Sequence, residues 1–267
     1  MSLHPGPPAA GGVILVSGPP GSGVPLAQRQ LVRMGLAVER SEGAPADADR
    51  LQDAALVEAG YRLLLSLEAS DGRCLGRAGP PWALTPWPRG RRPSLAVLGA
   101  ARALLRPARA RAQLRLDTTQ LGPAAVGRRL RRLVPLALDP TAAPILVLES
   151  FSFLLGPPLD AEWIIDARFL RNPFWEPELR GLTGRDAAVR RFVLDQPAAT
   201  AALTALGEMV HAVEPAYRER GRRLLRVAVG CTGGQHRSVA MVEAASRAWR
   251  RRGRLAVAWH RDCPLRP

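Results

Sequence analysis

Residues 227–238 place glycines, a cysteine, a histidine and an arginine between a predicted strand and a predicted helix. Glycines allow consecutive amide N–H groups to converge on one anion, and the N-terminus of the following helix adds partial positive charge. An arginine can add a two-pronged contact, and hydroxyl and imidazole groups add further donors. The spacing therefore predicts a binding site for one phosphate group. The residues expected to contact it are Thr232, Gly233, Gly234, His236, Arg237 and Ser238.

Cys231 and Arg237 also fit a second interpretation, because Cys-x₅-Arg-Ser is the spacing of cysteine phosphatases. In those enzymes a thiolate at the base of the loop is acidified by the surrounding amides and attacks phosphorus. Gly230, however, stands where a histidine usually precedes the cysteine, and no general-acid aspartate is recognisable in a suitable loop. Cys231 is therefore expected to be a packed loop thiol, and no catalytic residue is assigned.

A glycine-rich turn near residue 20 has P-loop spacing, because Gly18-x₄-Gly23 follows a predicted strand and precedes a predicted helix. In such loops a lysine contacts the β- and γ-phosphates and a hydroxyl binds Mg²⁺. Val24 and Pro25 occupy those two positions here, so hydrolysis is expected to be lost. Glu68 stands where a Walker-type acid is expected, and an ordinary strand-end role is favoured for it. The degenerate nucleotide contacts are assigned to Gly18, Gly21, Ser22 and Gly23.

Asp166 ends another predicted strand, in a second neighbourhood rich in glycine and proline. Because parallel strands bring their carboxyl ends to one rim, Asp166 and the Cys231 loop are expected to face the same crevice. A carboxylate there could bind sugar hydroxyls or an amine. The alternative is that Asp166 pairs with Arg168 or caps a turn.

The charge balance predicts affinity for polyanions. The formal net charge is +15, and every one of the 38 basic residues is arginine. Arginine pairs with phosphate in a fork that lysine cannot form, so RNA is the expected polyanion. The alternative is that the arginines are solvated on helix faces and helix ends. The residues assigned to RNA are Arg222, Arg223, Arg250, Arg251, Arg252 and Arg254.

Length and composition exclude several other classes of protein. The 267 residues suggest one large domain or two ordinary ones, and a hydrophobic fraction of 47% argues against wholesale disorder. No apolar run reaches the ~20 residues that span a bilayer. The cysteines Cys74, Cys231 and Cys263 are too few for a disulfide framework. A soluble cytoplasmic protein without a membrane partner is expected, and no metal site is assigned.

The elements that must position these residues alternate along the chain. Strands are predicted at 12–17, 37–39, 61–68, 113–117, 145–150, 163–166, 224–230 and 255–259. Helices are predicted at 26–34, 51–59, 94–105, 123–132, 200–214 and 238–252, loops at 70–92 and 169–184, and a linker at 138–144. The alternation predicts an α/β fold with parallel sheets covered on both faces. We expect a degenerate P-loop-like domain over residues 1–142 and a C-terminal α/β domain over residues 143–267.

Several motifs in series point to one family. They are 149–153, 160–161, 166–173, 179–186, 227–238 and 260–262, and residues 13–23, 91–94 and 114–119 agree more loosely. In this order and spacing they resemble the RapZ/YvcJ family of bacterial nucleotide-binding and RNA-adapter proteins. The first half is shortened between Glu68 and Ser94, where the family has a second strand and a lid-like basic region.

The resemblance implies that the C-terminal domain senses a phosphorylated metabolite, glucosamine-6-phosphate in characterised members, and binds structured small RNA. It implies that the RNA is presented to an endoribonuclease and that ATP or GTP is the nucleotide ligand. A homo-oligomer is a separate hypothesis, and the sequence does not give the oligomeric state. Phe174 stands where some members have a pocket histidine, and Gln235 where others have lysine. Carried over, the metabolite pocket consists of Asp166, Cys231, Thr232, Gly233, Gly234, His236 and Arg237.

The leading hypothesis is a non-enzymatic adapter that responds to a phosphometabolite and associates with RNA, with a decayed nucleotide-binding half. The rival is an enzyme, either a residual P-loop NTPase or a Cys231-dependent phosphatase. A third hypothesis is that RNA binding has also been lost, which leaves a metabolite sensor for a protein partner.

Overall fold

The computed structural model describes residues 12–77, 94–139 and 144–263. The chain divides into two compact units, Met1–Pro140 and Thr141–Pro267. The domain boundary expected between residues 142 and 143 lies outside the described residues. Within the described ranges, each unit is built on a parallel sheet of four strands with helices between them, which confirms the predicted α/β fold.

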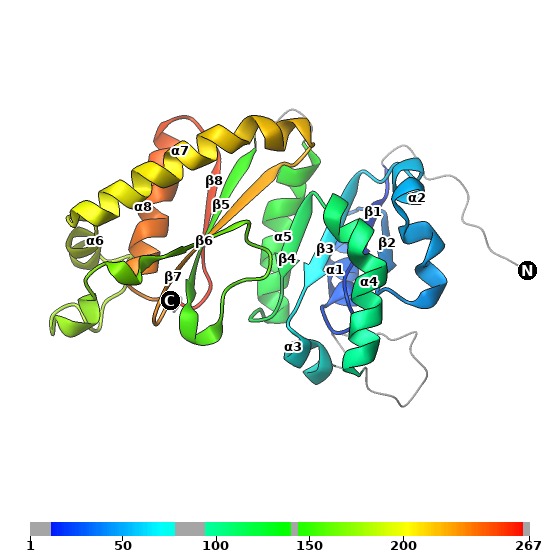
Figure 1. Ribbon diagram of the computed structural model, residues 1–267, viewed down its shortest axis with the longest axis horizontal. Coiled ribbons are helices and arrows are strands. Elements are labelled where there is room, and N and C mark those ends of the chain that lie inside the picture. The colour runs from blue at the N-terminus through cyan, green and yellow to red at the C-terminus, as the bar shows by residue number, and fades with distance from the viewer. Residues whose placement is uncertain (1–11, 78–93, 140–143, 264–267) are drawn as a thin grey trace, which may run out of the picture. The chain divides into compact units, whose positions relative to one another are not determined.

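In the first unit the strands are arranged in the order β2-β1-β3-β4. They are β1 (Ile14–Ser17), β2 (Val38–Ser41), β3 (Leu63–Glu68) and β4 (Leu114–Asp117). The helices are α1 (Val24–Arg33), α2 (Asp53–Glu58), α3 (Asp71–Gly76), α4 (Leu95–Arg111) and α5 (Pro123–Leu138), and the 3₁₀ turns are η1 (Pro45–Asp47) and η2 (Asp49–Leu51) (Figure 1). Alternation places Leu15 and Leu64 on the sheet face that packs against Leu56 of α2 and Leu105 of α4.

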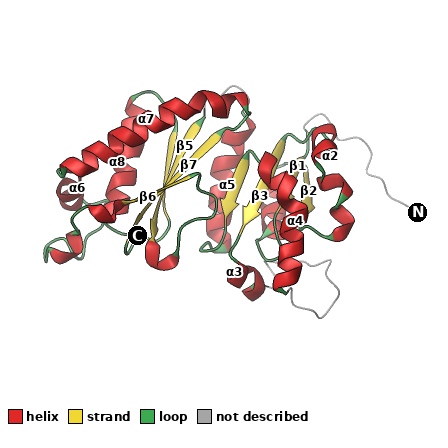
Figure 2. Ribbon diagram, viewed as in Figure 1, coloured by secondary structure: helices red, strands yellow, loops and turns green. Residues whose placement is uncertain are grey.

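In the second unit the strands are arranged in the order β6-β7-β5-β8. They are β5 (Ile145–Ser152), β6 (Trp163–Asp166), β7 (Leu224–Cys231) and β8 (Ala256–His260). The helices are α6 (Ala187–Leu194), α7 (Pro197–Glu219) and α8 (Arg237–Arg251), and the 3₁₀ turns are η3 (Phe153–Leu155), η4 (Ala167–Phe169) and η5 (Pro173–Trp175) (Figure 2). Residues of all three helices share one apolar core with strand residues such as Leu148 and Val227.

The register of the second sheet brings four strand ends to one edge. Ser152 of β5 lies beside Cys231 of β7, and Asp166 of β6 lies beside Gly230. On the other side of β5, Ser150 lies beside His260, the last residue of β8. All four strands are parallel, so the segments that follow them leave the sheet together, where α/β sheets commonly bind ligands.

Two parts of the predicted organisation differ from the structure. The loop expected over residues 70–92 begins as helix α3, which buried Cys74 anchors and whose first turn carries Asp71 at its positive end. Residues 78–93 lie outside the described residues. The expected linker over 138–144 begins at the last residue of α5, Leu138, and its residues 140–143 lie outside the described residues. No helix was predicted where α6 forms. The eight residues of α6 give too short a pattern to recognise, although Val189 and Val193 are buried four residues apart.

A buried ionic cluster fixes the centre of the second sheet. Arg226 of β7 is 4% exposed and forms ion pairs with Asp160, at 2.8 Å between Nη2 and Oδ2, and with Glu149 of β5, at 3.4 Å between Nη2 and Oε2. The main-chain N–H of Arg226 donates to the Glu162 carboxylate at 2.7 Å. The cluster therefore ties β5 and β7 to the segment that leads into β6. None of the described helices has the length and apolar character needed to cross a membrane.

Glu42, next to β2, gives the first unit a pH-dependent stability. Its side chain is buried, its Oε1 atom has no hydrogen-bond partner, and burial raises the pKa of this carboxyl from 4.5 to about 7. The folded protein therefore keeps the proton over a pH range in which the unfolded chain has lost it. Since the folded state binds more protons in that range, the free energy of unfolding falls as the pH rises.

We expect the protein to lose about 2 kcal/mol of stability between about pH 5.5 and pH 7.5 through this group, and Glu42→Gln to remove that loss. Urea denaturation at both pH values measures the difference. Glu58→Gln, on the exposed end of α2, is the matched control and should leave the pH dependence unchanged. Equal pH dependence in Glu42→Gln and in the parent protein would contradict the assignment.

Candidate functional site

The segments after the four strands of the second unit are held together by polar contacts. The guanidinium of Arg168, in η4 after β6, lies over the ring of Phe153, in η3 after β5, at 4.2 Å. Arg237, which starts α8 after β7, donates from Nη1 to the main-chain carbonyls of Arg168 at 3.2 Å and Leu170 at 3.0 Å. Three loops thus meet around the residues that the sequence assigned to an anion.

In the loop between β7 and α8, several main-chain carbonyls accept hydrogen bonds from neighbouring segments, whereas the amides of residues 233–238 remain available as donors within the described ranges. The Thr232 carbonyl accepts from Ser152 Oγ at 2.6 Å, and the Gln235 carbonyl accepts from the Gly184 amide at 2.8 Å. The His236 carbonyl accepts from Ala240 as the first turn of α8 closes. In the part of the chain that the structure describes, the amides of residues 233–238 donate to no acceptor. Consecutive amide N–H groups at a helix N-terminus can bind an anion, because they donate hydrogen bonds toward one point and carry partial positive charge.

Arg237 is a buried charge without a matching carboxylate. Its side chain is 5% exposed, and Nη2 also donates to Thr232 Oγ1 at 3.3 Å. Its Nε atom is buried and has no hydrogen-bond partner. Among the described residues no carboxylate forms an ion pair with it, although Asp166 lies near enough for the guanidinium to help lower the pKa of that carboxyl. A buried guanidinium with a free donor is costly unless an anion satisfies it.

Gly234 allows the loop to turn tightly over the end of β5. Its φ is +69°, which favours glycine, and a Cβ there would lie 2.8 Å from the Ser152 amide nitrogen. Gly233 has open space around it and is exposed, so it lies on the accessible side of the loop with Thr232. The two glycines therefore have different roles, one in packing and one in access.

Asp166 is half exposed and is already engaged. Its carboxylate accepts from Arg168 Nε and Nη2 at 2.7–3.0 Å and from the Arg168 amide at 2.8 Å, so it both pairs with Arg168 and caps η4. The hydrogen bonds from Arg168 hold the pKa of this carboxyl below its usual value. Both features that the alternative interpretation expected are present, and the shared rim still leaves the Asp166 carboxylate near Arg237.

His236 lies on the buried side of the loop. Burial lowers its pKa, and the nearby carbonyls of Arg180 and Leu182 oppose that shift. A Cβ on Gly184 would lie 2.3 Å from the His236 carbonyl oxygen, so the 180–184 segment packs directly on the start of α8. His236 therefore holds the loop against the 180–184 segment on the buried side. Its Nε2 atom is buried without a hydrogen-bond partner.

Cys231 and Ser238 form the buried floor of the loop. Cys231 is 2% exposed and Ser238 is fully buried, and Sγ lies 3.1 Å from Ser238 Oγ. The thiol is at the end of β7, within the sheet. This geometry suits a packed thiol, because a nucleophile must reach its substrate.

Gly230 has no room for any side chain. A Cβ there would lie 2.4 Å from the Phe151 ring and 2.5 Å from the Phe153 ring. We expect Gly230→Ala to lower the free energy of unfolding by about 1 to 3 kcal/mol, because extra atoms would strain a packed core. Gly233→Ala, with nothing near its Cβ, is the matched control and should change it by less than about 0.5 kcal/mol in urea denaturation. Equal stability of the two variants would refute this packing.

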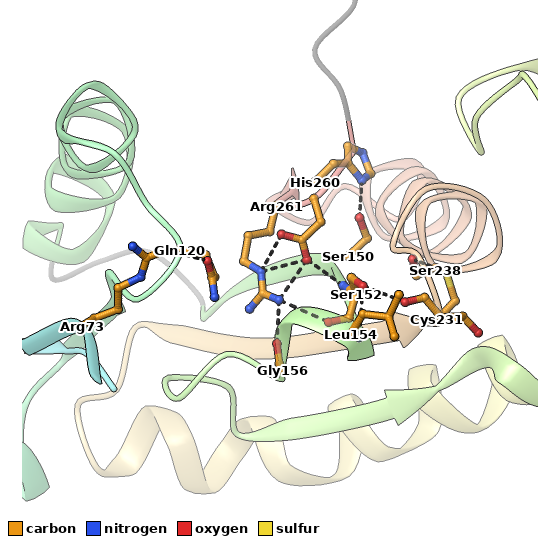
Figure 3. A network of polar contacts seen from close by, with 12 residues as sticks. Arg73, Gln120, Ser150, Ser152, Leu154, Gly156, Cys231, Ser238, His260 and Arg261 are labelled. Carbon is orange, nitrogen blue, oxygen red and sulfur yellow. Dashed lines mark hydrogen bonds and ion pairs between the residues drawn. The ribbon is translucent and has the colours of Figure 1, made fainter. Parts of the chain in front are cut away.

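Arg261 and Asp262, which follow β8, complete the rim, and the sequence pattern gave them no role. Asp262 accepts from the Ser152 amide at 2.7 Å, and Arg261 donates from Nη2 to the Gly156 carbonyl at 2.6 Å. The two side chains also pair with each other and are almost fully buried. Figure 3 shows this network beside the Cys231–Ser238 contact. The signals in the sequence were the family-like motif 260–262 and its position directly after a predicted strand.

Ser150, His260 and Glu243 are arranged in the order of a hydrolase triad. His260 Nδ1 lies 2.9 Å from Ser150 Oγ, and Nε2 lies 3.0 Å from Glu243 Oε1. Ser150, however, is fully buried within β5, so its hydroxyl is closed to a substrate. The chain of contacts therefore ties β5, β8 and α8 together. No group of His, Cys, Asp and Glu side chains suited to hold a metal ion occurs among the described residues.

In the first unit the degenerate P-loop is packed from both sides. Residues 18–23 lie between β1 and α1, and they and the first two residues of α1 are all buried. A Cβ on Gly21, whose φ is +83°, would lie 2.4 Å from the Cys74 carbonyl oxygen of α3. The Ser22 amide donates to the Pro19 carbonyl, and the Ser22 carbonyl accepts from Thr118 Oγ1 at 2.8 Å. The turn follows β1 and precedes α1 as predicted, and α3 packs directly against it at Gly21.

The residue at the position of a Walker-type acid, Glu68, forms an ion pair within the first unit. Glu68 ends β3 and is nearly buried, and its Oε1 atom accepts from Arg109 Nε of α4 at 2.6 Å. This ion pair fits the strand-end role that the sequence favoured for Glu68.

The arginines assigned to RNA lie at the other end of the strands of the second sheet, away from the 232–236 loop that follows β7. Arg222 and Arg223 precede β7, and the others end α8 or precede β8. Several have internal partners: Arg250 donates to the Ala256 carbonyl, Arg254 pairs with Glu214, and Arg222 lies 3.9 Å from the Glu162 carboxylate. Arg251 and Arg252 are exposed. The two predicted binding sites are thus separated by the length of the strands.

Comparison with known proteins places these features in a family. The family model of the RapZ C-terminal domain matches residues 144–264. A nucleotide-binding protein of Corynebacterium jeikeium is 45% identical over 161 residues, which are 60% of this chain and 55% of that protein. A nucleotide-binding protein of Mycobacterium ulcerans is 44% identical over 168 residues, 62% of this chain and 54% of that protein.

A longer match comes from a nucleotide-binding protein of Mycobacterium tuberculosis, which is 36% identical over 224 residues, 84% of this chain and 73% of that protein. The chain thus spans about half the length of the first two relatives and almost three quarters of the third. The match extends well beyond the C-terminal domain. The chain belongs to the RapZ-like family of nucleotide-binding proteins.

Proposed function

We propose that the second unit binds a phosphorylated small metabolite on the loop between β7 and α8. The observation that carries this proposal is Arg237, a buried guanidinium with an unused Nε donor and no carboxylate partner among the described residues. It lies directly beside a run of amides that donate to no described acceptor. A phosphate group supplies the negative charge and the acceptor oxygens that both features lack.

The metabolite belongs to the amino-sugar phosphates, with glucosamine-6-phosphate as the first candidate. Family membership supports this class, and the Asp166 carboxylate near Arg237 suits an amine or a sugar hydroxyl. Thr232 and Gly233 leave the loop open to solvent on one side. Phe174, 44% exposed after β6, stands where some family members have histidine, so the hydroxyl pattern that is recognised can differ from theirs.

RNA is the proposed macromolecular partner, and the arginines at the other edge of the sheet are its proposed contacts. Arg251 and Arg252 are exposed at the end of α8, where they can reach backbone phosphates. Binding of this kind weakens steeply as the salt concentration rises. The protein would then act as an adapter, joining a metabolite signal to an RNA or to an endoribonuclease that processes it.

ATP or GTP binding, which the names of the relatives suggest, is proposed to be lost or weak in this chain. The lysine and hydroxyl positions hold Val24 and Pro25, and α3 packs against the loop at Gly21. The alternative functions are a residual NTPase and a phosphatase that uses Cys231. Both require turnover, which the adapter does not.

Calorimetric titration of the whole protein tests the proposal. We expect glucosamine-6-phosphate to bind at least about tenfold more tightly than inorganic phosphate, which corresponds to about 1.4 kcal/mol from the sugar contacts. Glucose-6-phosphate, which lacks the amine, is the matched ligand. Absence of binding by all three would overturn the metabolite assignment. Turnover of ATP or of p-nitrophenyl phosphate, abolished in the latter case by Cys231→Ser, would establish an enzyme instead.

A further inference from the structure

We propose that a second small-molecule site lies between α7 and α8 and takes an amphipathic anion, such as a medium-chain carboxylate. A cavity of about 420 Å³ lies here, within the range of ligand pockets. Its lining includes Leu146 of β5, Leu203 and Leu206 of α7, and Trp249 of α8. Leu146 is at the start of β5 and Trp249 at the end of α8, so the cavity is at the opposite edge of the sheet from the 232–236 loop.

A glycine in the middle of α7 keeps the cavity open. Gly207 lines it, and a Cβ there would meet only Arg252 Nη1, at 3.8 Å, which is ordinary contact distance. Glycine weakens a helix interior, so packing alone favours a larger residue at this position. Close approach of α8 does not require glycine either, because nothing else lies within 4 Å. The hollow is therefore a property of this residue, and a larger side chain would fill it.

The polar atoms of the lining favour a ligand that accepts hydrogen bonds. Trp249 is 6% exposed, and its Nε1 is buried without a hydrogen-bond partner. That atom has almost no accessible surface, so Trp249 contributes its apolar ring to the cavity wall and the Arg252 guanidinium is the donor available to a ligand. The lining also contains His211, the exposed Arg252 and the carboxylate of Glu208. Within the described ranges the Arg252 guanidinium forms no ion pair.

These features together define the class of ligand. The leucines and Trp249 accommodate an apolar body, and the Arg252 guanidinium suits a carboxylate head group. Glu208 disfavours a head group on its side, which directs the anion toward Arg252. This cavity shares no residue with the 232–238 loop, so its ligand can be tested independently of phosphate binding there. Arg252 is, however, one of the arginines proposed to contact RNA.

Calorimetric titration of the whole protein with octanoate and with 1-octanol tests the site. We expect octanoate to bind with a dissociation constant below about 1 mM and Gly207→Leu to weaken it at least about tenfold, because the leucine fills the cavity. Ala205→Leu, an exposed position on the same helix outside the lining, should leave binding unchanged. The helix should tolerate both variants, since each replaces its residue with a good helix former.

The head group is tested separately. Arg252→Gln should weaken octanoate about two- to fivefold and leave 1-octanol unchanged, because only the anion uses the guanidinium. Trp249→Phe should weaken both ligands, since the smaller ring removes part of the apolar wall that both contact. Absence of octanoate binding up to about 10 mM, or equal binding by the parent protein and Gly207→Leu, would overturn the proposal. Binding of phosphate, or its absence, bears only on the other site.

Discussion

Arg237→Gln should lower the affinity of the protein for glucosamine-6-phosphate about 30- to 150-fold. A charge-assisted hydrogen bond in a buried site contributes about 2 to 3 kcal/mol, which gives a change of this size. The free Nε donor and the uncompensated charge of Arg237 are both lost in this variant. Glutamine keeps a polar side chain beside the carbonyls of Arg168 and Leu170. Calorimetric titration measures the change.

Two further variants make the result specific. Arg237→Lys keeps the charge but loses Nε and the planar fork, so its affinity should lie between those of Arg237→Gln and the parent protein. Arg168→Gln removes an exposed arginine of the same rim that pairs with Asp166, and it should cost less than about fivefold. Unchanged affinity in Arg237→Gln, with the far-ultraviolet spectrum of the folded protein preserved, would exclude Arg237 from the site.

Arg226→Met should lower the free energy of unfolding by about 3 to 5 kcal/mol, the largest stability effect expected for a single substitution in this chain. Glu149 and Asp160, which are 4% and 1% exposed at their side chains, would remain buried after losing the guanidinium at 2.8–3.4 Å. A buried carboxylate without its partner is far costlier than the pair itself is favourable. Urea denaturation followed by circular dichroism measures the loss.

The matched control is Arg251→Met, which makes the same chemical change at an exposed position on α8. It should change the free energy of unfolding by less than about 0.5 kcal/mol. Replacing Arg226, Glu149 and Asp160 together by Met, Leu and Asn should recover most of the loss, because no charge then stays buried alone. A loss in Arg226→Met no larger than in Arg251→Met would refute the role of the cluster.

The sheets could be predicted from the sequence because their strands are short, largely apolar and rich in branched residues. Trp163–Asp166 forms β6 with the predicted limits, and β7 extends the predicted 224–230 strand by only Cys231. The glycines after β7 marked the next turn correctly, since Gly234 has a positive φ. The position of the candidate loop therefore followed from local pattern alone.

The contacts that occupy the candidate residues could not be predicted, because they join segments far apart in the chain. Arg237 Nη1 donates hydrogen bonds to main-chain carbonyls 67 and 69 residues earlier in the chain, and Gly184 packs against the start of α8. Neither contact has a periodic signal in the sequence. The same holds for α3, whose Cys74 packs on the P-loop turn from about fifty residues downstream. Spacing predicted the turn at Gly18–Gly23 but not what fills it.

The central claim is that the amides of residues 233–238, with Arg237, hold a phosphate group. The most direct measurement is the titration of the ¹⁵N-labelled protein with inorganic phosphate, followed residue by residue through the amide chemical shifts. The account predicts that the largest changes occur at residues 233–238 and saturate together, while the amides of residues 250–254 move little. Changes confined to the arginines at the end of α8, or no saturable change at the loop, would contradict it.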